Sequence, residues 1–424
     1  MRILLAIHNA YTDNTSGAAR ATRTLMEWLV EAGHECAVIG TARFDAKPPD
    51  DIDVHLSELG FNLDRQPAPE GFLEFLRGRG DEGIGCDTVR FAMNGVPVVM
   101  LKTQHNQAGE PDRTEFEQFL YHFDMLVAAT RPDLVITYGA HPVVYESMRR
   151  ANAQGVTTLF WLHNSGYEDK RHFEYADYVL TPCNFLTRHY RDTVEIEATD
   201  IPPAINYDEV YAGEENRTFL TFINPSPSKG VSLFARLADM LGSARPDIPI
   251  LVVQSAADAT LLNSVPGIDF SNYPQILASP PVQRPADFFE LTKILLVPSV
   301  FREPFGTVAA EAMLNGIPAL VSDRGGLPDT VADAGTVLPL PDWLTPETKQ
   351  IVEIEDAQPW FDAVCTLWDD QDAYRAAAAK ARDTADRLYA ESVLKARYVE
   401  YVEGLCPELY LPSADLDFDS DDLM

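Results

Sequence analysis

Short apolar segments alternate with amphipathic helical patterns at the beginning of the chain. Residues 3–7 form an apolar run that predicts a buried strand. A helical pattern begins at Gly17 and ends at Gly33, and apolar residues recur in it at helical spacing: Leu25, Trp28, Leu29 and Ala32. Residues 36–39 are the next apolar run. This order of strand, helix and strand is typical of a βαβ unit and predicts a parallel sheet.

The same alternation continues to about residue 180. Further strands are predicted at 98–101, 134–137, 157–162 and 178–180, and helices at 115–130 and 144–152. Residues 41–95 show neither the hydrophobic period of a helix nor that of a strand, and they contain clustered Pro, Gly and Asp. We therefore expect loops in that segment.

A second α/β series follows a linker-like stretch at 200–217. Its predicted strands are 219–223, 250–254, 294–297 and 319–322, and its predicted helices are 231–241, 307–315, 357–368, 372–388 and 393–403. We expect two Rossmann-like domains at 1–200 and 201–389, with a last helix at about 390–410 that packs back on the first domain. Ligands of such sheets lie at the carboxyl ends of the strands, so the expected site is the cleft between the domains.

Length and charge narrow the classes of function. The 424 residues exceed one ordinary core of up to ~250–300 residues and fit two domains. The net charge is −32, which disfavours nucleic acid and anionic membrane surfaces, because both bind through clustered Lys and Arg. Residues 412–424 carry five Asp and no Lys or Arg, which predicts a disordered acidic tail, with an interaction segment as the alternative.

Cysteine spacing and hydropathy indicate the compartment. The five cysteines are widely separated and include no CxxC pair, so we expect reduced thiols. The apolar run at the N-terminus is too short for a signal peptide, and no apolar stretch approaches the ~20 residues of a membrane span. A cytoplasmic protein without stable membrane insertion is expected.

The segment from 298 to 330 carries the most informative pattern. An apolar strand ends at Pro298, a loop with Glu303 follows, and Gly306 and Thr307 precede a helix. The amino end of a helix presents unpaired N–H groups and a partial positive charge. Gly306 permits a ligand to approach the backbone closely, and Thr307 is expected to cap the helix. Together these features predict an anion site suited to a diphosphate.

Two glutamates flank this predicted anion site. Glu311 lies about one turn inside the helix, where its carboxylate could accept hydrogen bonds from two ribose hydroxyls. Glu303 lies in the preceding loop and could accept hydrogen bonds from a donor sugar. One nucleotide-sugar would thus explain both carboxylates and the glycine. In isolation the two glutamates would need no ligand, because acidic residues at a helix amino end also complement its dipole.

The complete string resembles the Glu-x7-Glu motif of retaining GT-B glycosyltransferases, especially the large family 4. That family shows five short motifs after an apolar strand, and here they read Pro298-Ser299, Glu303-Pro304-Phe305-Gly306, Glu311-Ala312-Met313, Gly316-Ile317-Pro318 and Gly325-Gly326. A weaker similarity extends from residue 1 to about 410. The resemblance implies the α/β GT-B architecture, with two Rossmann-like domains facing across a central cleft, and a nucleotide-sugar donor bound around Phe305.

The resemblance also implies donor contacts from three other places. Lys229 matches a diphosphate-binding lysine, whereas Asn224 stands where the family usually has arginine. His163 ends the predicted strand 157–162 and matches a histidine that contacts the donor sugar. Gly17 matches one of two adjacent glycines in the first turn of the family. The alternative interpretations are an exposed loop lysine for Lys229, a structural histidine for His163 and a simple helix start for Gly17.

The implied reaction is metal-independent, retaining transfer of a sugar to an acceptor. Lys229 and the helix amino end would stabilise the leaving diphosphate, while Glu303 and His163 position the sugar. No metal-binding pattern is apparent, and no cofactor besides the donor substrate is implied. His105 and His141 follow apolar strands and are weaker candidates to face the acceptor. The sequence identifies neither the base, the sugar, the acceptor nor the oligomeric state.

Three other functions stay open at this point. Sugar phosphorylases and nucleotide-sugar epimerases share the architecture but differ in reaction. A nucleotide-sugar-binding protein that has lost catalysis is a second alternative, because Asn224 departs from the family pattern. A dinucleotide oxidoreductase with two Rossmann halves is the third, although no GxGxxG follows either first strand.

Overall fold

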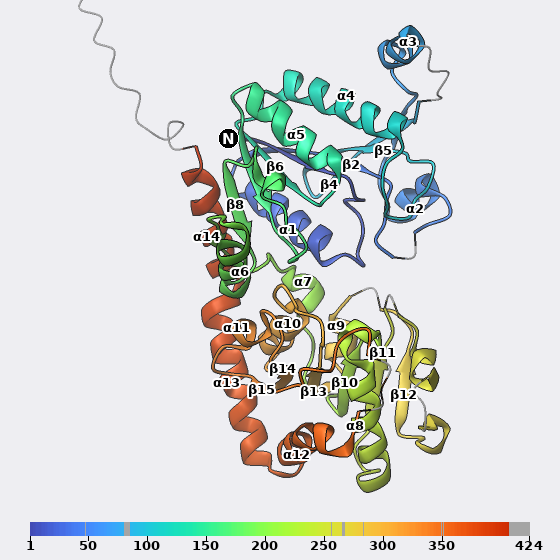
Figure 1. Ribbon diagram of the computed structural model, residues 1–424, viewed down its shortest axis with the longest axis vertical. Coiled ribbons are helices and arrows are strands. Elements are labelled where there is room, and N and C mark those ends of the chain that lie inside the picture. Colours follow the sequence, from blue (N-terminus) through green and yellow to red (C-terminus); the bar gives the residue numbers. More distant parts are fainter. Residues whose placement is uncertain are drawn as a thin grey trace, which may run out of the picture.

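In the computed structural model the chain forms two α/β units stacked along its long axis (Figure 1). The structure describes residues 1–406 except 47, 80–84, 256, 265–267, 283, 349 and 351. The expected acidic tail at 412–424 lies outside these residues. Within the described ranges, no helix has the length and apolarity needed to cross a membrane.

The first unit is built on a nine-stranded sheet in the order β3-β4-β5-β2-β1-β6-β7-β8-β9. The strands are β1 (Arg2–Ile7), β2 (Glu35–Thr41), β3 (Asp64–Gln66), β4 (Thr88–Met93), β5 (Val96–Leu101), β6 (Leu134–Tyr138), β7 (Thr157–Trp161), β8 (Tyr178–Thr181) and β9 (Thr199–Asp200). The helices are α1 (Gly17–Glu31), α2 (Ile52–Glu58), α3 (Glu70–Gly78), α4 (Arg113–Thr130), α5 (Pro142–Ala153), η1 (Lys170–Phe173) and α6 (Asn184–Val194). The central strands pair in parallel and are apolar on both faces, because helices cover both sides of such a sheet.

The expectation of loops throughout 41–95 is wrong. This segment contains α2, β3, α3 and β4, and β4 pairs with β5 as an antiparallel hairpin. The connecting residues Asn94 and Gly95 have φ angles of 49° and 82°. A two-residue Asn-Gly hairpin loop requires positive φ at both positions. Asn-Gly is a strong hairpin signal, but the Pro, Gly and Asp around it obscure the period of the strands.

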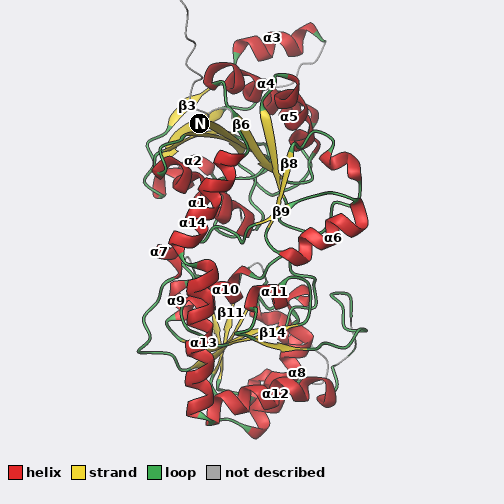
Figure 2. Ribbon diagram, turned by 90° about the vertical axis from the view of Figure 1, so that its left-hand side faces the viewer, coloured by secondary structure: helices red, strands yellow, loops and turns green. Residues whose placement is uncertain are grey.

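The second unit contains a six-stranded parallel sheet in the order β12-β11-β10-β13-β14-β15. Its strands are β10 (Phe219–Ile223), β11 (Ile250–Val253), β12 (Ile276–Ser279), β13 (Thr292–Val297), β14 (Ala319–Ser322) and β15 (Thr336–Leu338). The helices before and within it are α7 (Tyr207–Val210), η2 (Pro227–Lys229), α8 (Val231–Ala244), η3 (Ala259–Ser264), η4 (Phe270–Asn272), α9 (Ala286–Phe289), α10 (Thr307–Leu314), α11 (Leu327–Val331) and α12 (Ile354–Asp369). Parallel strands send their following loops to one edge of the sheet, here the edge that faces the first unit (Figure 2).

The last two helices run along both units (Figures 1 and 2). Helix α13 (Gln371–Tyr389) lies beside the second unit, and α14 (Glu391–Gly404) packs on α1 of the first. Tyr398 of α14 is buried against Trp28 and Trp161, with ring centroids 6.1 and 5.5 Å away. Its hydroxyl donates a hydrogen bond to the carbonyl oxygen of Pro202 at 2.9 Å. The C-terminal helix therefore belongs to the core of the first unit.

Direct contacts also join the two units beside α6. The amide of Phe185, in the first turn of α6, donates to the carboxylate of Asp329 on α11 at 2.6 Å. Asp329 thus satisfies an unpaired N–H group at the amino end of a helix in the other unit. The thiol of Cys183 donates to the carbonyl oxygen of Pro304 at 2.9 Å. These contacts hold α11 and the loop before α10 against the first unit.

The position of Tyr398 generates a stability prediction. Replacing Tyr398 with Phe removes one buried hydrogen bond and should lower the free energy of unfolding by about 1 kcal/mol. Replacing it with Ala also leaves a cavity between two tryptophans and should cost about 4 kcal/mol. Denaturant unfolding of both variants, followed by tryptophan fluorescence, measures the two losses. Equal small losses would contradict the role of α14 as part of the core.

Candidate active site

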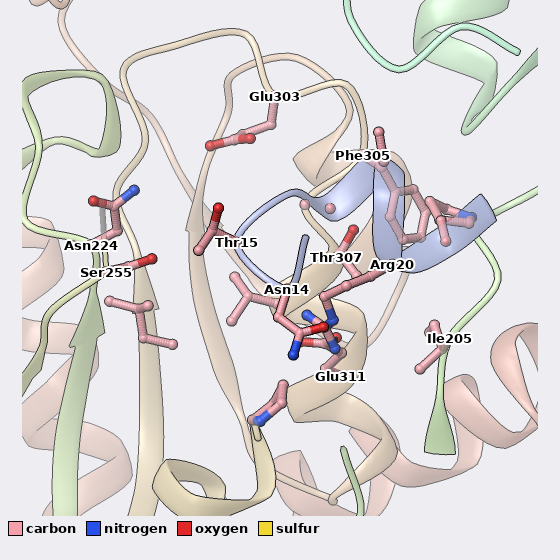
Figure 3. A pocket seen from close by; sticks show the side chains of 18 of the residues that line it. Asn14, Thr15, Arg20, Ile205, Asn224, Ser255, Glu303, Phe305, Thr307 and Glu311 are labelled. Carbon is pink, nitrogen blue, oxygen red and sulfur yellow. Dashed lines mark hydrogen bonds and ion pairs between the residues drawn. The ribbon is translucent and has the colours of Figure 1, made fainter. Parts of the chain in front are cut away.

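A cavity of about 760 Å³ lies between the two units, with lining residues from both. It opens at the carboxyl ends of the strands, where ligands of α/β sheets bind (Figure 3). All nine residues that the sequence analysis assigns to the site line this one cavity: Gly17, His163, Asn224, Lys229, Glu303, Phe305, Gly306, Thr307 and Glu311. The fold therefore brings together residues that are up to 294 positions apart, from 17 to 311.

Glu303 is held at the cavity by side chains from two loops. It follows β13, and its Oε1 accepts a hydrogen bond from the hydroxyl of Ser299 at 2.6 Å. The same oxygen lies 2.6 Å from Nζ of Lys229, which ends η2 after β10. Glu303 is 7 % exposed, so both contacts compensate a carboxylate that has little access to water. Neighbouring strands β10 and β13 thus bring a cation and a carboxylate to the same point.

The pair Gly325-Gly326 supports the backbone of Glu303. The amide of Gly326 donates to the carbonyl oxygen of Glu303 at 2.7 Å. Gly325 has a φ of 64°, and a Cβ atom there would overlap the amide nitrogen and carbonyl oxygen of Glu303. A glycine is therefore required by packing as well as by conformation. The double glycine after β14 positions the Glu303 loop.

Helix α10 begins at the cavity in a way that differs from the prediction. The N-cap is Gly306, and Thr307 is the first helical residue and makes no side-chain cap. The expectation that the Thr307 hydroxyl caps the helix is therefore wrong. Gly306 has a φ of 101°, and a Cβ atom there would overlap the side chain of Leu327. Phe305 is 3 % exposed and packs edge-on against Tyr389. Packing against Leu327 and Tyr389 therefore fixes the conformation of residues 305 and 306 before the helix.

Glu311 is buried and ion-paired with a residue of the first unit. Its Oε1 lies 3.1 Å from Nη2 of Arg20 on α1, as Figure 3 shows. Arg20 also lies 3.7 Å from Oε2 of Glu209 on α7, the short helix between the two sheets. Burial raises the pKa of Glu311, and the charge and hydrogen bond of Arg20 oppose that rise. Arg20 is a residue of the site that sequence reasoning missed, although it lies one turn after Gly17.

Asn224 and Gly17 have surroundings that bear on their expected roles. Asn224 has a φ of 56°, and its Oδ1 accepts a hydrogen bond from the amide of Ala257 at 3.1 Å. The side chain therefore fixes the loop after β11 while it lines the cavity. A Cβ atom added to Gly17 would meet no atom within 4 Å. Gly17 thus faces open cavity, and no close packing in the described structure requires its glycine.

His163 lies at the end of β7 between two aromatic rings. The ring centroids of Trp161 and Tyr138 are 4.7 and 5.1 Å from that of His163. Its Nε2 is buried and has no hydrogen-bond partner among the described residues. Burial lowers the pKa of His163 well below its usual range, so the imidazole is neutral near pH 7. A neutral ring offers one donor and one acceptor to a ligand.

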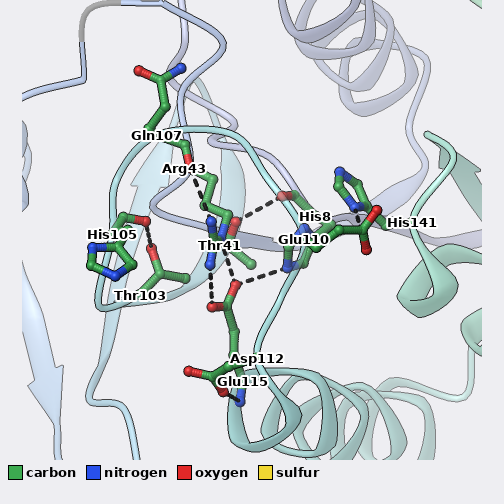
Figure 4. A network of polar contacts seen from close by, with 10 residues as sticks. All are labelled: His8, Thr41, Arg43, Thr103, His105, Gln107, Glu110, Asp112, Glu115 and His141. Atoms are coloured by element: carbon green, nitrogen blue, oxygen red, sulfur yellow. Dashed lines mark hydrogen bonds and ion pairs between the residues drawn. The ribbon is translucent and has the colours of Figure 1, made fainter.

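The weaker acceptor candidates His105 and His141 do not line the cavity. They border a polar network at the carboxyl ends of β1 and β2 (Figure 4). Its centre is the buried carboxylate of Glu115, which pairs with Arg43 at 2.6 Å and with Nε2 of His8 at 2.9 Å. His141 packs against His8, and their ring centroids are 4.7 Å apart. Neither this network nor any other part of the described chain groups three His, Cys, Asp or Glu side chains in a way that could hold a metal ion.

A comparison with known families matches part of the chain. Residues 209–384 match the family model described as glycosyl transferases group 1. The matched residues run from within α7 to within α13 and make up less than half of the 424 residues. The matched segment includes Lys229, Glu303 and Glu311, whereas Gly17, Arg20 and His163 lie outside it.

Curated relatives cover the chain in part. A D-inositol 3-phosphate glycosyltransferase of Paenarthrobacter aurescens is 29 % identical over 193 residues, which is 42 % of this chain and 42 % of the relative. The protein of the same name from an Arthrobacter species is 31 % identical over 167 residues, or 36 % of each chain. The chain thus aligns with less than half the length of these relatives.

Solved structures match over nearly the whole chain. Sucrose-phosphate synthase of Thermosynechococcus elongatus has a TM-score of 0.66 at 17 % identity, covering 96 % of this chain and all of that one. HepE of Anabaena, solved with UDP and glucose, has a TM-score of 0.61 at 14 % identity, covering 94 % and 99 %. These similarities confirm the predicted α/β GT-B fold.

The Arg20–Glu311 pair generates the next prediction. Burial raises the pKa of Glu311 in the folded protein above its pKa in the unfolded chain. The folded state therefore binds a proton more tightly, and the stability that this proton contributes is lost as pH rises through the pKa of the folded state. Replacing Arg20 with Met should raise the pKa of Glu311 further, so it should destabilise the protein more at pH 8 than at pH 5. In the double variant with Glu311→Gln, this difference between the two pH values should disappear. The coupling energy between Arg20 and Glu311 should be about 2 kcal/mol.

Arg188 provides the matched control for this double-mutant cycle. It lies 4.0 Å from Asp329 across the same interface, but both side chains are more exposed. Arg188→Met should change the free energy of unfolding by less than about 0.5 kcal/mol at either pH. A coupling between Arg20 and Glu311 as small as this would contradict the importance of the buried pair.

Proposed function

We propose that this protein transfers a sugar from a nucleoside-diphosphate sugar to an acceptor hydroxyl, with retention of anomeric configuration and without a divalent metal. The observation that carries the proposal is the grouping of Glu303, Glu311 and Lys229 around the amino end of α10 in one cavity. The match of residues 209–384 to the group 1 family model and the GT-B fold support it.

The ribose and the diphosphate of the donor each have a chemically suitable partner in the cavity. The two oxygens of Glu311 would accept hydrogen bonds from the ribose hydroxyls, sharing the carboxylate with Arg20. The diphosphate would lie against the first amides of α10, which lack partners within the helix. Lys229 would add a positive charge, since an ammonium group has three donors and can keep its contact with Glu303.

The proposed reaction breaks the bond between the anomeric carbon and the diphosphate oxygen. Negative charge develops on the departing diphosphate, where Lys229 and the α10 amides would stabilise it. The acceptor oxygen would bond to the same face of the sugar, and its proton would pass to the departing phosphate. Glu303 and the neutral His163 would hold the sugar hydroxyls during this step. The second unit would supply donor binding, and the first unit would present the acceptor.

Removal of the Glu311 carboxylate tests the donor assignment. Glu311→Ala should lose two charge-assisted hydrogen bonds and weaken binding of the preferred nucleotide about 100-fold, equivalent to about 3 kcal/mol. Calorimetry with UDP, GDP and ADP identifies that nucleotide and measures the loss. Glu355→Ala is the matched control, because Glu355 is an exposed carboxylate on α12. Unchanged affinity for all three nucleotides in Glu311→Ala would refute the assignment.

Glu303 should affect turnover more than nucleotide affinity, because it is proposed to contact the sugar. Glu303→Ala is expected to bind the preferred diphosphate within about threefold of wild type. It should reduce the rate of donor cleavage at least about 100-fold, as removal of an interaction made mainly in the transition state does. Chromatography of nucleotide-sugar and products over time measures this rate. Equal rates in Glu303→Ala and wild type would exclude the proposed role.

A further inference from the structure

The first unit presents a nearly uncharged wall to the cavity. Its polar lining residues are Asn14, Thr15, His55, His163 and Asn164. Leu59 adds an apolar side chain that is 46 % exposed. Arg20 is the one permanently charged residue among the lining residues of this unit that the structure describes, and it is paired with Glu311 and Glu209. This wall faces the donor site from the other unit.

His55 has hydrogen-bonding capacity that its own surroundings do not use. It lies on α2 and packs edge-on against Phe44, with ring centroids 5.6 Å apart. Its Nε2 is buried, and no described residue forms a hydrogen bond with it. Burial lowers the pKa of His55 against the opposing charges of Glu58 and Asp13, so the ring is neutral near pH 7. His55 nevertheless lines the cavity, so a polar ligand would meet the part of the ring that faces the cavity and not the enclosed Nε2.

The charges behind the wall disfavour an anionic ligand. The carboxylate of Asp13 is buried there and accepts hydrogen bonds from the amide and hydroxyl of Thr15, both at 2.7 Å. A phosphate monoester would approach this carboxylate without a free cation from the described lining of this unit. Binding sites for such groups normally supply arginine or lysine. Amide, hydroxyl and neutral imidazole groups instead match sugar or polyol hydroxyls.

We propose that the wall formed by Asn14, Thr15, His55 and Leu59 is the acceptor subsite, and that it takes an uncharged polyhydroxylated compound, with His55 bonded to one of its hydroxyls. The proposal rests on the proposed glycosyl transfer. An uncharged compound differs from the phosphorylated inositol that the relatives' names contain. His55 is thereby assigned to acceptor recognition and not to donor binding.

Matched pairs of acceptors test the charge preference. The full-length protein is incubated with each nucleotide-sugar whose diphosphate it binds, and release of the diphosphate is followed. The pairs are inositol and inositol 3-phosphate, glucose and glucose 6-phosphate, and glycerol and glycerol 3-phosphate. At least one uncharged member should accelerate release tenfold or more above the rate without acceptor, and its phosphorylated partner should not.

Variants of His55 test the residue itself. His55→Ala should lower the acceleration by the active acceptor at least tenfold, and His55→Gln should recover part of it, because the amide restores a donor and an acceptor. Diphosphate affinity and the slow release without acceptor should stay at the wild-type level in both variants, which also shows that they fold. His105→Ala is the matched control, since His105 is exposed and lies outside the cavity lining.

The outcomes separate this inference from the proposed function. Failure to bind any nucleotide or cleave any nucleotide-sugar counts against glycosyl transfer itself. With slow donor cleavage present, three results overturn the acceptor subsite: a phosphorylated member that outperforms its partner, a panel in which no uncharged member accelerates release, or a His55→Ala variant that responds like wild type.

Discussion

The site depends on the way three loops pack around the backbone and carboxylate of Glu303. Lys229 comes from the loop after β10, Ser299 from the loop after β13, and the Gly325-Gly326 pair from the loop after β14. These strands are adjacent and parallel, so their loops meet at one edge of the sheet. A buried carboxylate is stable there because a hydroxyl and an ammonium group compensate it. The position of Glu303 at the cavity thus follows from strand order.

A second buried carboxylate connects the site to the other half of the molecule. Glu311 has its cationic partner, Arg20, on a helix of the first unit, and Arg20 also faces Glu209 between the sheets. Separation of the units would leave Glu311 without this cation, in a position where burial already raises its pKa. The relative position of the two units and the ionisation of a carboxylate that lines the cavity are therefore linked by one ion pair.

Prediction from the sequence succeeded where local pattern and local chemistry coincide. Apolar strands followed by amphipathic helices identified both sheets, and the nine assigned site residues do share one cavity. It failed for residues 41–95, where the hairpin turn Asn94-Gly95 lies among other turn-forming residues. It also failed for the Thr307 cap, because Gly306 occupies the N-cap position. Arg20 and His55 carry no local motif, so their place at the cavity could not be read from neighbouring residues.

The sequence alone determined the α/β class, the two sheets and the loop between β13 and α10, because hydrophobic period and helix-start chemistry act over a few neighbouring residues. The tertiary structure decided which distant groups compensate the buried charges. It placed Arg20 against Glu311, 291 positions away, and Lys229 against Glu303, 74 positions away. Such pairings depend on the packing of whole units across a cleft, and no periodic signal in the chain records that packing.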